Sequence, residues 1–421
     1  MMNRMTLAGL MVPNNNVASG GSRLRVEVIS DFETLVSAQP VWDRLVDQAG
    51  IDHPFLGHDW ILSWWEAFGA GRKLNILLVR DGEELVGIAP LMMSRQRMYG
   101  VPVRELGFIY NDHTPRFDFI VARDHASVYE AIWRHLCDRR EEWDLLKLCQ
   151  IDSSSRTMLE LPLLAAASGC EVGTWPSIES PYLRLEGTFE PYFKSLHSGL
   201  RQNLKRRMKR LEEHGAVEFE CVSAEDQIDS ALPEAFRMEA ASWKGEAGTA
   251  IGCHSDLQRF YSLVAHRAAR RGALYLTFLR ANGRRIAFDL SLIHNNRRFI
   301  LKPGYLQEYR TCSPGQQLTA MTIRDAFARG LSEIDFLGAA EAWKLSWTSE
   351  RRKNYWLFVF QKDLRGSLLH YTKFRFVPWL REKAFYAPLR DGMLNLRGMF
   401  ARGGGVTDAA GGAHHDGIQV G

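Results

Sequence analysis

The sequence predicts an α+β fold made of two related halves, each with a mixed, mostly antiparallel sheet flanked by helices. Residues 74–93 and 275–294 share one pattern, in which an apolar run, an Asp-Gly or Asn-Gly pair and a second apolar run follow one another. Asp-Gly and Asn-Gly accept the positive φ angles of tight two-residue turns, so both segments are expected to form β-hairpins. Aligning Gly82 with Gly283 matches Leu85 to Ile286.

The predicted elements around the two hairpins follow the same order. In the first half these are a strand at 24–29, helices at 31–48 (with Asp31 as N-cap) and 59–68, strands near 103–109 and 117–121, a helix at 127–140 and a strand at 145–150. In the second half they are helices near 189–196, 201–214, 231–244 and 256–271, a strand at 298–303, a helix that begins at 313–315 and a strand at 333–337. This order favours a sheet with a V-shaped split over a doubly wound parallel sheet. No G-x-G-x-x-G follows a predicted strand, which argues against a dinucleotide-binding fold.

Composition limits the function classes. The 421 residues include 53 basic and 49 acidic side chains, and a net charge of +4 does not indicate that the whole chain binds nucleic acid. The six cysteines form no C-x-x-C pair, so reduced thiols are expected and a metal site is not. No apolar run approaches the ~18 residues of a spanning helix, and we expect a cytoplasmic protein. Residues 1–22 and 403–421 are predicted to be disordered.

A helix start in the second half is the strongest candidate binding site. Ser313 suits an N-cap, Pro314 suits the first helical position, and the free amides of such a start can hold a phosphate or diphosphate. The predicted diphosphate ligands are Arg310, Ser313, Gly315 and Gln316, with Lys302 adding positive charge nearby. The alternative is a well-formed cap that binds nothing.

Several polar and aromatic residues near this helix are candidates for catalysis or substrate binding. Asp335 stands between apolar neighbours and is the predicted general base, with a structural carboxylate as the alternative. Tyr305 or Tyr309 is predicted to protonate the leaving group. The predicted substrate-binding residues are Asp289, Lys302, Glu341, Trp343, Lys344, Trp347, Arg201 and Lys205.

Two further segments are basic. Residues 198–215 predict an amphipathic helix whose outer face carries Arg201 and Lys205, either for an anionic acceptor or as a solvated surface. Residues 364–400 combine basic and aromatic side chains, which suits either a helix docked on the second half or an arm lying on a membrane surface.

The segments LKPGYLQEYRTCSPGQQL and DFLGAAEAWKLSWT resemble the C-terminal half of tandem GNAT-like acyltransferases. The nearest branch is the CelD-like one, associated with cellulose biosynthesis and distantly related to the FemAB transferases. The resemblance covers about residues 25–360 and implies an acyl-CoA donor whose diphosphate lies at the helix start. FemAB relatives use aminoacyl-tRNA instead, and the strict GNAT loop R/Q-x-x-G-x-G/A is absent here.

These observations predict two tandem domains, a degenerate GNAT-like domain at 23–175 and an acyltransferase domain at 176–362, followed by a helical arm at 363–402. The predicted enzyme moves an acyl group from acyl-CoA directly to an amine or hydroxyl acceptor, in exopolysaccharide or cell-envelope biosynthesis. No nucleophile motif predicts a covalent acyl-enzyme. The alternatives are transfer from aminoacyl-tRNA and an inactive GNAT-like module in polysaccharide assembly.

Overall fold

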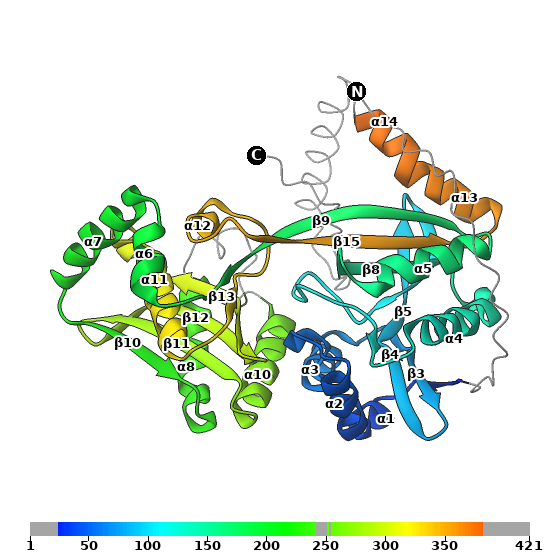
Figure 1. Cartoon of the computed structure of the whole chain (residues 1–421), viewed down its shortest axis with the longest axis horizontal. Coiled ribbons are helices and arrows are strands. Elements are labelled where there is room, and N and C mark those ends of the chain that lie inside the picture. Colours follow the sequence, from blue (N-terminus) through cyan, green and yellow to red (C-terminus); the bar gives the residue numbers. More distant parts are fainter. Residues whose placement is uncertain (1–23, 241–250, 252–253, 382–421) are drawn as a thin grey trace, which may run out of the picture.

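The computed structural model describes residues 24–240, 251 and 254–381 (Figure 1). Several predictions lie outside these residues: the disordered segments 1–22 and 403–421, Cys253, the end of the helix expected at 231–244, and the arm beyond residue 381. The five described cysteines, Cys137, Cys149, Cys170, Cys221 and Cys312, form no disulfide with one another. Within the described ranges, we find no helix whose length and hydropathy suit it to crossing a bilayer.

The first half follows the predicted order with three differences. The helix expected at 31–48 is two helices, the strand expected at 117–121 is limited to Ile120–Val121, and a helix at Arg156–Ala167 was not predicted. Asp31 caps the first helix by accepting the Thr34 N–H at 2.8 Å. The elements are β1 (Arg25–Ile29), α1 (Phe32–Ser37), α2 (Gln39–Gln48), η1 (Pro54–Leu56), α3 (His58–Phe68), β2 (Lys73–Leu74), β3 (Ile76–Asp81), β4 (Glu84–Ala89), β5 (Leu91–Met98), β6 (Val101–Phe108), β7 (Ile120–Val121), α4 (His125–Asp138), η2 (Arg140–Glu142), β8 (Leu145–Asp152) and α5 (Arg156–Ala167).

The second half contains the predicted helices and hairpin together with strands that the sequence pattern did not predict. Its elements are β9 (Glu171–Arg184), α6 (Phe189–Ser195), α7 (Ser198–Glu212), β10 (Val217–Val222), α8 (Glu225–Ala240), α10 (Ser255–Arg270), β11 (Leu274–Ala281), β12 (Arg284–His294), β13 (Arg297–Tyr305), η4 (Gln307–Cys312), α11 (Pro314–Ala328), β14 (Glu333–Asp335), α12 (Ala342–Leu345) and β15 (Arg351–Phe360). The terminal arm follows as α13 (Leu364–Tyr371), η5 (Thr372–Phe376) and α14 (Val377–Arg381).

The described strands form two sheets, and the α+β prediction is confirmed. A four-stranded sheet has the order β1-β3-β4-β7, and an eleven-stranded sheet has the order β10-β11-β12-β13-β14-β9-β15-β8-β6-β5-β2. In the described part of the chain only β13–β14 and β6–β8 pair in parallel. The long strands β9 and β15 run along one side of the molecule and join the two halves (Figure 1). The predicted boundary at 175/176 falls inside β9.

The two hairpins share a distortion, which supports an internal repeat but shifts its alignment by one residue. Ala281 pairs with Arg284 around the predicted Asn282-Gly283 turn, whereas Asp81 pairs with Glu84, so the first turn is Gly82-Glu83. Val86 is an extra residue on β4, and Ile286 is an extra residue on β12, as in a β-bulge. The structural alignment therefore places Gly82 on Asn282, and the expected match of Gly82 with Gly283 was wrong.

The two halves also begin an equivalent helix in the same way. Asp124 precedes α4 with φ +44°, and Ser313 precedes α11 with φ +48°, both in the left-handed region that non-glycine residues rarely adopt. Neither side chain caps its helix with a hydrogen bond. The backbone geometry is thus repeated, although the sequence indicated no counterpart of the Ser-Pro-Gly start in the first half.

Apolar and charged contacts fasten the halves together. The Trp60 ring on α3 meets the Phe260 ring on α10 edge to face, with centroids 5.1 Å apart. Arg116, from the loop between β6 and β7, donates to the carboxylate of Asp335 on β14 at 2.7 Å. Arg352 on β15 donates to the same carboxylate oxygen at 3.1 Å, and Asp335 is fully buried. Asp335 therefore joins two arginines at the junction, and each has a second carboxylate partner: Asp52 for Arg116 at 3.4 Å and Glu333 for Arg352 at 2.6 Å.

Replacing Asp335 by Asn is expected to destabilise the fold by about 3 kcal/mol, because it leaves the buried Arg116 with only the half-exposed Asp52 at 3.4 Å, whereas Arg352 retains Glu333 at 2.6 Å. Glu179→Gln is the matched control, since it breaks the exposed 3.2 Å Arg351–Glu179 pair between β9 and β15 and should change stability by less than about 1 kcal/mol. Urea unfolding measures both. Equal losses in the two variants would contradict this role of Asp335.

Candidate active site

The split in the sheet lies between β13 and β14. The two strands pair over three residues, with Arg297–Phe299 opposite Glu333–Asp335. β14 ends at Asp335, whereas β13 continues to Tyr305. In the described part of the chain β14 is the only strand on that side of β13, so no described strand pairs with this edge of β13 from Ile300 onward. This is the V-shaped split that the order of elements predicted.

A bulge interrupts β13 where it leaves β14. Ser291 on β12 is opposite Ile300, and the next residue, Leu290, is opposite Lys302, so Leu301 is an extra residue on β13. A bulge bends its strand and leaves backbone groups outside the ladder, and bulges are frequent beside active sites. The bulge therefore leaves Leu301 opposite no residue of β12, at the point where β13 leaves β14.

The start of α11 lies at the open end of the split. The short helix η4 runs into the left-handed Ser313, and this sequence of conformations turns successive amides toward one concavity. The prediction that the Ser313 side chain caps α11 was wrong: its Oγ accepts a hydrogen bond from the guanidinium of Arg207 on α7. Arg207 therefore brings a positive charge to the first turn of α11, which already favours anions through its amides and dipole.

Three predicted residues line this helix start. Tyr305, at the end of β13, packs against Gly315, where a side-chain carbon would lie 3.4 Å from the tyrosine ring. Gln316 donates to the carbonyl of Trp343 in α12 at 3.4 Å. The Oε1 atom of Gln316 is buried and has no hydrogen-bond partner among the described residues.

The far side of the split is a constrained turn. Leu337 has φ +52° and Gly338 has φ +62°, directly after β14. The Leu337 N–H donates to Asp335 at 2.9 Å, and the Lys344 ammonium donates to the Leu337 and Ala339 carbonyls at 2.8 and 3.0 Å. Lys344 is buried in this role, so the structure argues against its predicted role in binding substrate.

Asp335 and Asp289, the two carboxylates predicted for catalysis and substrate binding, are also buried and engaged by other protein groups. Asp335 accepts hydrogen bonds from Arg116, Arg352 and Leu337, and these contacts do not suit a general base that must take up a proton. Asp289 lies in the packed interior, where it accepts from Ser291 and faces Arg298 at 3.6 Å. Burial raises the pKa of Asp289, yet its side chain is out of reach of a substrate.

Some other predicted residues pack away from the split. Tyr309 packs against His214 beyond the end of α7, with ring centroids 5.5 Å apart, so a proton donor at the split is better sought in Tyr305. Trp347 is buried, and its carbonyl accepts from the Tyr192 hydroxyl at 2.9 Å. Glu341 pairs with Lys344 at 3.0 Å.

The predicted basic residues differ in their positions. Arg310 is exposed on η4, and its carbonyl accepts the Ser313 N–H at 3.1 Å. Arg201 donates to the Leu196 carbonyl at 3.1 Å, at the start of α7. Lys205 is exposed on the outer face of α7.

The first half contributes a side chain near the split. His113, in the loop between β6 and β7, lies with its Nδ1 atom 3.1 Å from the Tyr261 hydroxyl on α10. The ammonium of Lys302, next to the β13 bulge, lies 5.3 Å from the centre of the Tyr261 ring. Thr114 and Arg116 hold the loop through the Trp60 indole at 3.4 Å and through Asp335. A polar cluster therefore joins both halves beside β13.

Two side chains of this cluster have pKa values that are shifted by burial. Burial, followed by the positive charges of Lys302 and His254, lowers the pKa of His113 to about 3. Burial raises the pKa of the Tyr261 hydroxyl well above its usual value. At neutral pH the imidazole and the phenol are therefore both uncharged, and they suit hydrogen bonding to a substrate better than carrying charge.

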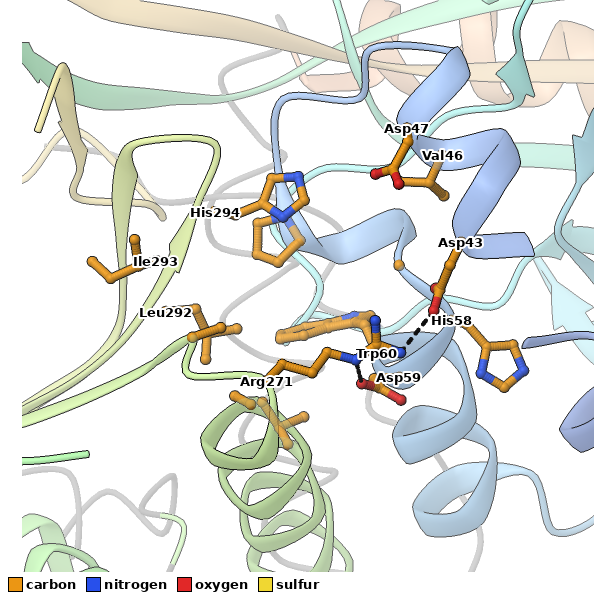
Figure 2. Close-up of a pocket in the computed structure, with 15 residues that line it drawn as sticks. Asp43, Val46, Asp47, His58, Asp59, Trp60, Arg271, Leu292, Ile293 and His294 are labelled. Carbon is orange, nitrogen blue, oxygen red and sulfur yellow. Dashed lines mark hydrogen bonds and ion pairs between the residues drawn. The ribbon is translucent and has the colours of Figure 1, made fainter. Parts of the chain in front are cut away.

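A separate cleft of about 170 Å³ lies where α2 and α3 face α10 and β12 (Figure 2). Trp60 forms part of its wall, and Arg271 points toward Asp43 and Asp59, with which it forms ion pairs. Because two carboxylates already neutralise Arg271, no free charge from it is available to a ligand. The cleft adjoins His294, the last residue of β12, which pairs with Arg297 at the start of β13, and we do not assign the chemistry to it.

Comparisons with known proteins agree with this geometry. Residues 198–345 match the model of the acetyltransferase (GNAT) domain, a range that includes Arg207, the split and α11. The chain has a GNAT fold. The solved structure of FemX resembles it with a TM-score of 0.53 and 11% sequence identity, over 79% of this chain and 98% of FemX. At that identity the likeness shows the GNAT fold alone.

Two other solved structures align more loosely. One is the C-terminal domain of a putative lysylphosphatidylglycerol synthetase from Agrobacterium fabrum, with a TM-score of 0.49, 11% identity, and coverage of 80% of this chain and 94% of that domain. The other is a tandem GNAT protein from the clavulanic acid biosynthesis pathway, with a TM-score of 0.45, 13% identity, and coverage of 80% and 98%. No curated protein is significantly similar in sequence. The CelD-like branch stays a prediction.

Two residues of the candidate site were not predicted from the sequence. Arg207 stands three residues after Leu204 and four before Leu211, both buried, and this spacing was a usable signal that it faces inward. His113 had no such signal, because its contact with Tyr261 joins positions 148 residues apart.

The low pKa of His113 predicts how stability depends on pH. The unfolded chain takes up a proton on this histidine near pH 6.5, whereas the folded chain does so only near pH 3, so the contribution is complete above pH 6.5 and is lost as pH falls toward 3. His113→Gln should therefore make stability less dependent on pH between 6.5 and 4, by up to about 1.4 kcal/mol per pH unit. Urea unfolding at several pH values measures this. The exposed His197→Gln is the control, and an unchanged slope in His113→Gln would contradict the assignment.

Proposed function

We propose that this chain transfers an acyl group from acyl-CoA to an amine or hydroxyl acceptor in the split between β13 and β14. The observation that carries the proposal is the meeting of the Arg207 guanidinium with the first turn of α11 at the open end of the split. The first-turn amides, the glycine at 315 and a cationic side chain together suit a diphosphate. The donor would bind with its diphosphate here and its thioester inside the split.

The interior of the split supports the chemistry of direct acyl transfer. The acceptor lone pair attacks the thioester carbonyl carbon and the C–S bond breaks. The acceptor nitrogen or oxygen releases its proton to water, and the thiolate of coenzyme A leaves and is protonated. Backbone N–H groups exposed by the Leu301 bulge are suited to polarise the carbonyl. We assign the protonation of the thiolate to Tyr305, which stands between the bulge and Gly315.

The acceptor would approach from the face of β13 that carries Lys302. There His113 and Tyr261 offer uncharged hydrogen-bonding groups, and we assign them the orientation of the acceptor. This replaces Asp335 in our account of the acceptor side, since Asp335 is occupied by two arginines. The first half therefore supplies part of the site.

A second candidate function, transfer from aminoacyl-tRNA, is favoured by one observation on α7. Its outer face exposes Lys205, Arg206, Lys209 and Arg210 next to Arg207, and no ion pair among the described residues neutralises them. Such a face suits a polyanion as well as it suits solvent. The donor titration below separates the two functions.

Arg207→Ala should weaken acetyl-CoA binding about tenfold or more, because a hydrogen bond to a charged group is worth about 1.5–3 kcal/mol. Arg206→Ala is the matched control on the same helix: Arg206 is exposed and donates to Asn203 at 2.7 Å, so binding should change less than about twofold. Isothermal titration calorimetry with acetyl-CoA measures both.

Equal affinities in Arg207→Ala and the native chain would refute the diphosphate site. The same titrations with uncharged tRNA at low and high salt address the second candidate. Tight tRNA binding that falls steeply with salt, without acetyl-CoA binding, would favour aminoacyl transfer. Acetyl-CoA binding without acetyl transfer to any of a broad panel of amines and alcohols would favour an inactive module.

A further inference from the structure

The terminal arm, α13 to α14, exposes a stripe of large apolar side chains. Leu364 is 92% exposed, Leu368 is 62% exposed and Trp379 is 50% exposed, and Tyr371 and Phe376 are also exposed. Residues spaced by three or four positions share one side of a helix, and the wider π turn at η5 keeps Phe376 and Trp379 on the side of Leu364. The stripe therefore continues along the whole described arm.

The opposite side of the arm is firmly packed on the sheet. Leu369 is buried with Phe358 and Phe360 of β15, and the Phe374 ring lies directly over Gly173 of β9, where no side chain has room. Figure 1 shows α13 lying over the long strands β9 and β15, with α14 extending outward from the body. The exposed stripe is thus not required for docking of the arm, and it faces away from the rest of the described chain.

The arm is also basic. Residues 364–381 contain no Asp or Glu, and they contain Arg365, Lys373, Arg375 and Arg381. Over residues 364–402 the sequence has eight Lys and Arg residues and two Asp and Glu residues, an excess of six positive charges in a chain whose net charge is +4. The positive charge of the protein is therefore concentrated in this segment and the residues that follow it.

We propose that this arm binds the surface of an anionic lipid bilayer, with Leu364, Leu368, Tyr371, Phe376 and Trp379 entering the interface. Arg375 is exposed beside Phe376, whereas Arg365 pairs with Asp144 at 3.4 Å and the Lys373 ammonium lies 4.5 Å from the centre of the Phe358 ring. An exposed apolar stripe in a basic segment, with a tryptophan near its end, is the pattern of a helix that lies in the plane of a membrane surface. A second copy of the chain is a poorer partner for this apolar stripe, because pairing two such basic arms would bring like charges together. This inference does not depend on the proposed acyl transfer.

The test is co-sedimentation of the full-length protein with vesicles of phosphatidylcholine alone and of phosphatidylcholine mixed with phosphatidylglycerol. The native protein should sediment with the mixed vesicles, and raising the salt to about 1 M should release a large part of it, since the Debye length is then only about 3 Å. The triple variant Leu364→Ser, Leu368→Ser, Trp379→Ser should lose at least tenfold in the lipid partition coefficient.

The matched control is Leu159→Ser with Leu163→Ser on α5, where two leucines with the same spacing are 55% and 70% exposed. This control should bind vesicles as the native chain does, and thermal unfolding should show that both variants remain folded. Equal binding by the arm variant and the native chain, or no binding of the native chain to mixed vesicles, would overturn the proposal. A dimer that the arm variant alone abolishes, without lipid binding, would overturn it in favour of a second copy.

Discussion

A buried carboxylate at the end of β14 organises the junction on which the site depends. Asp335 accepts from Arg116 of the first half, from Arg352 of β15 and from the Leu337 amide. The last of these bonds accompanies the left-handed turn at Leu337, where β14 stops while β13 continues. The first bond holds the loop that brings His113 to Tyr261. The split and the polar cluster beside it are thus consequences of one desolvated charge network.

The two halves share a scaffold and differ in chemistry. Their hairpins carry equivalent bulges at Val86 and Ile286, and their equivalent helices begin after the left-handed Asp124 and Ser313. An acidic side chain at 124 would repel a phosphate, whereas the hydroxyl of Ser313 is bound by Arg207. In our account the second half binds the donor, and the first half contributes the loop that carries His113.

Short sequence patterns were enough to predict the hairpins and the amphipathic helices, which depend mainly on neighbouring residues. Turn residues located both hairpins, and the spacing of Leu204 and Leu211 located α7, because these features depend on neighbouring residues. The strands β9 and β15 were missed: Pro176 and Pro181 break the strand pattern of β9, and β9 is held by pairing with a strand more than 160 residues away.

The candidate site was only partly predictable for the same reason. The helix start with Ser313, Gly315 and Gln316 was found, since Ser-Pro-Gly is a local signal. A buried aspartate among apolar residues suggests either catalysis or a structural ion pair, and only the positions of Arg116 and Arg352 decide between them for Asp335. Arg116 lies 219 residues from Asp335 along the chain, and Arg352 lies 17 residues away on β15, beyond the turn that follows β14.

The most direct measurement is the structure of the protein crystallised with coenzyme A. The account predicts diphosphate oxygens within hydrogen-bonding distance, about 3 Å, of the Gly315 amide and the Arg207 guanidinium, with the thiol between β13 and β14. A diphosphate bound elsewhere, for example in the cleft beside Arg271, with Arg207 still on Ser313, would contradict it.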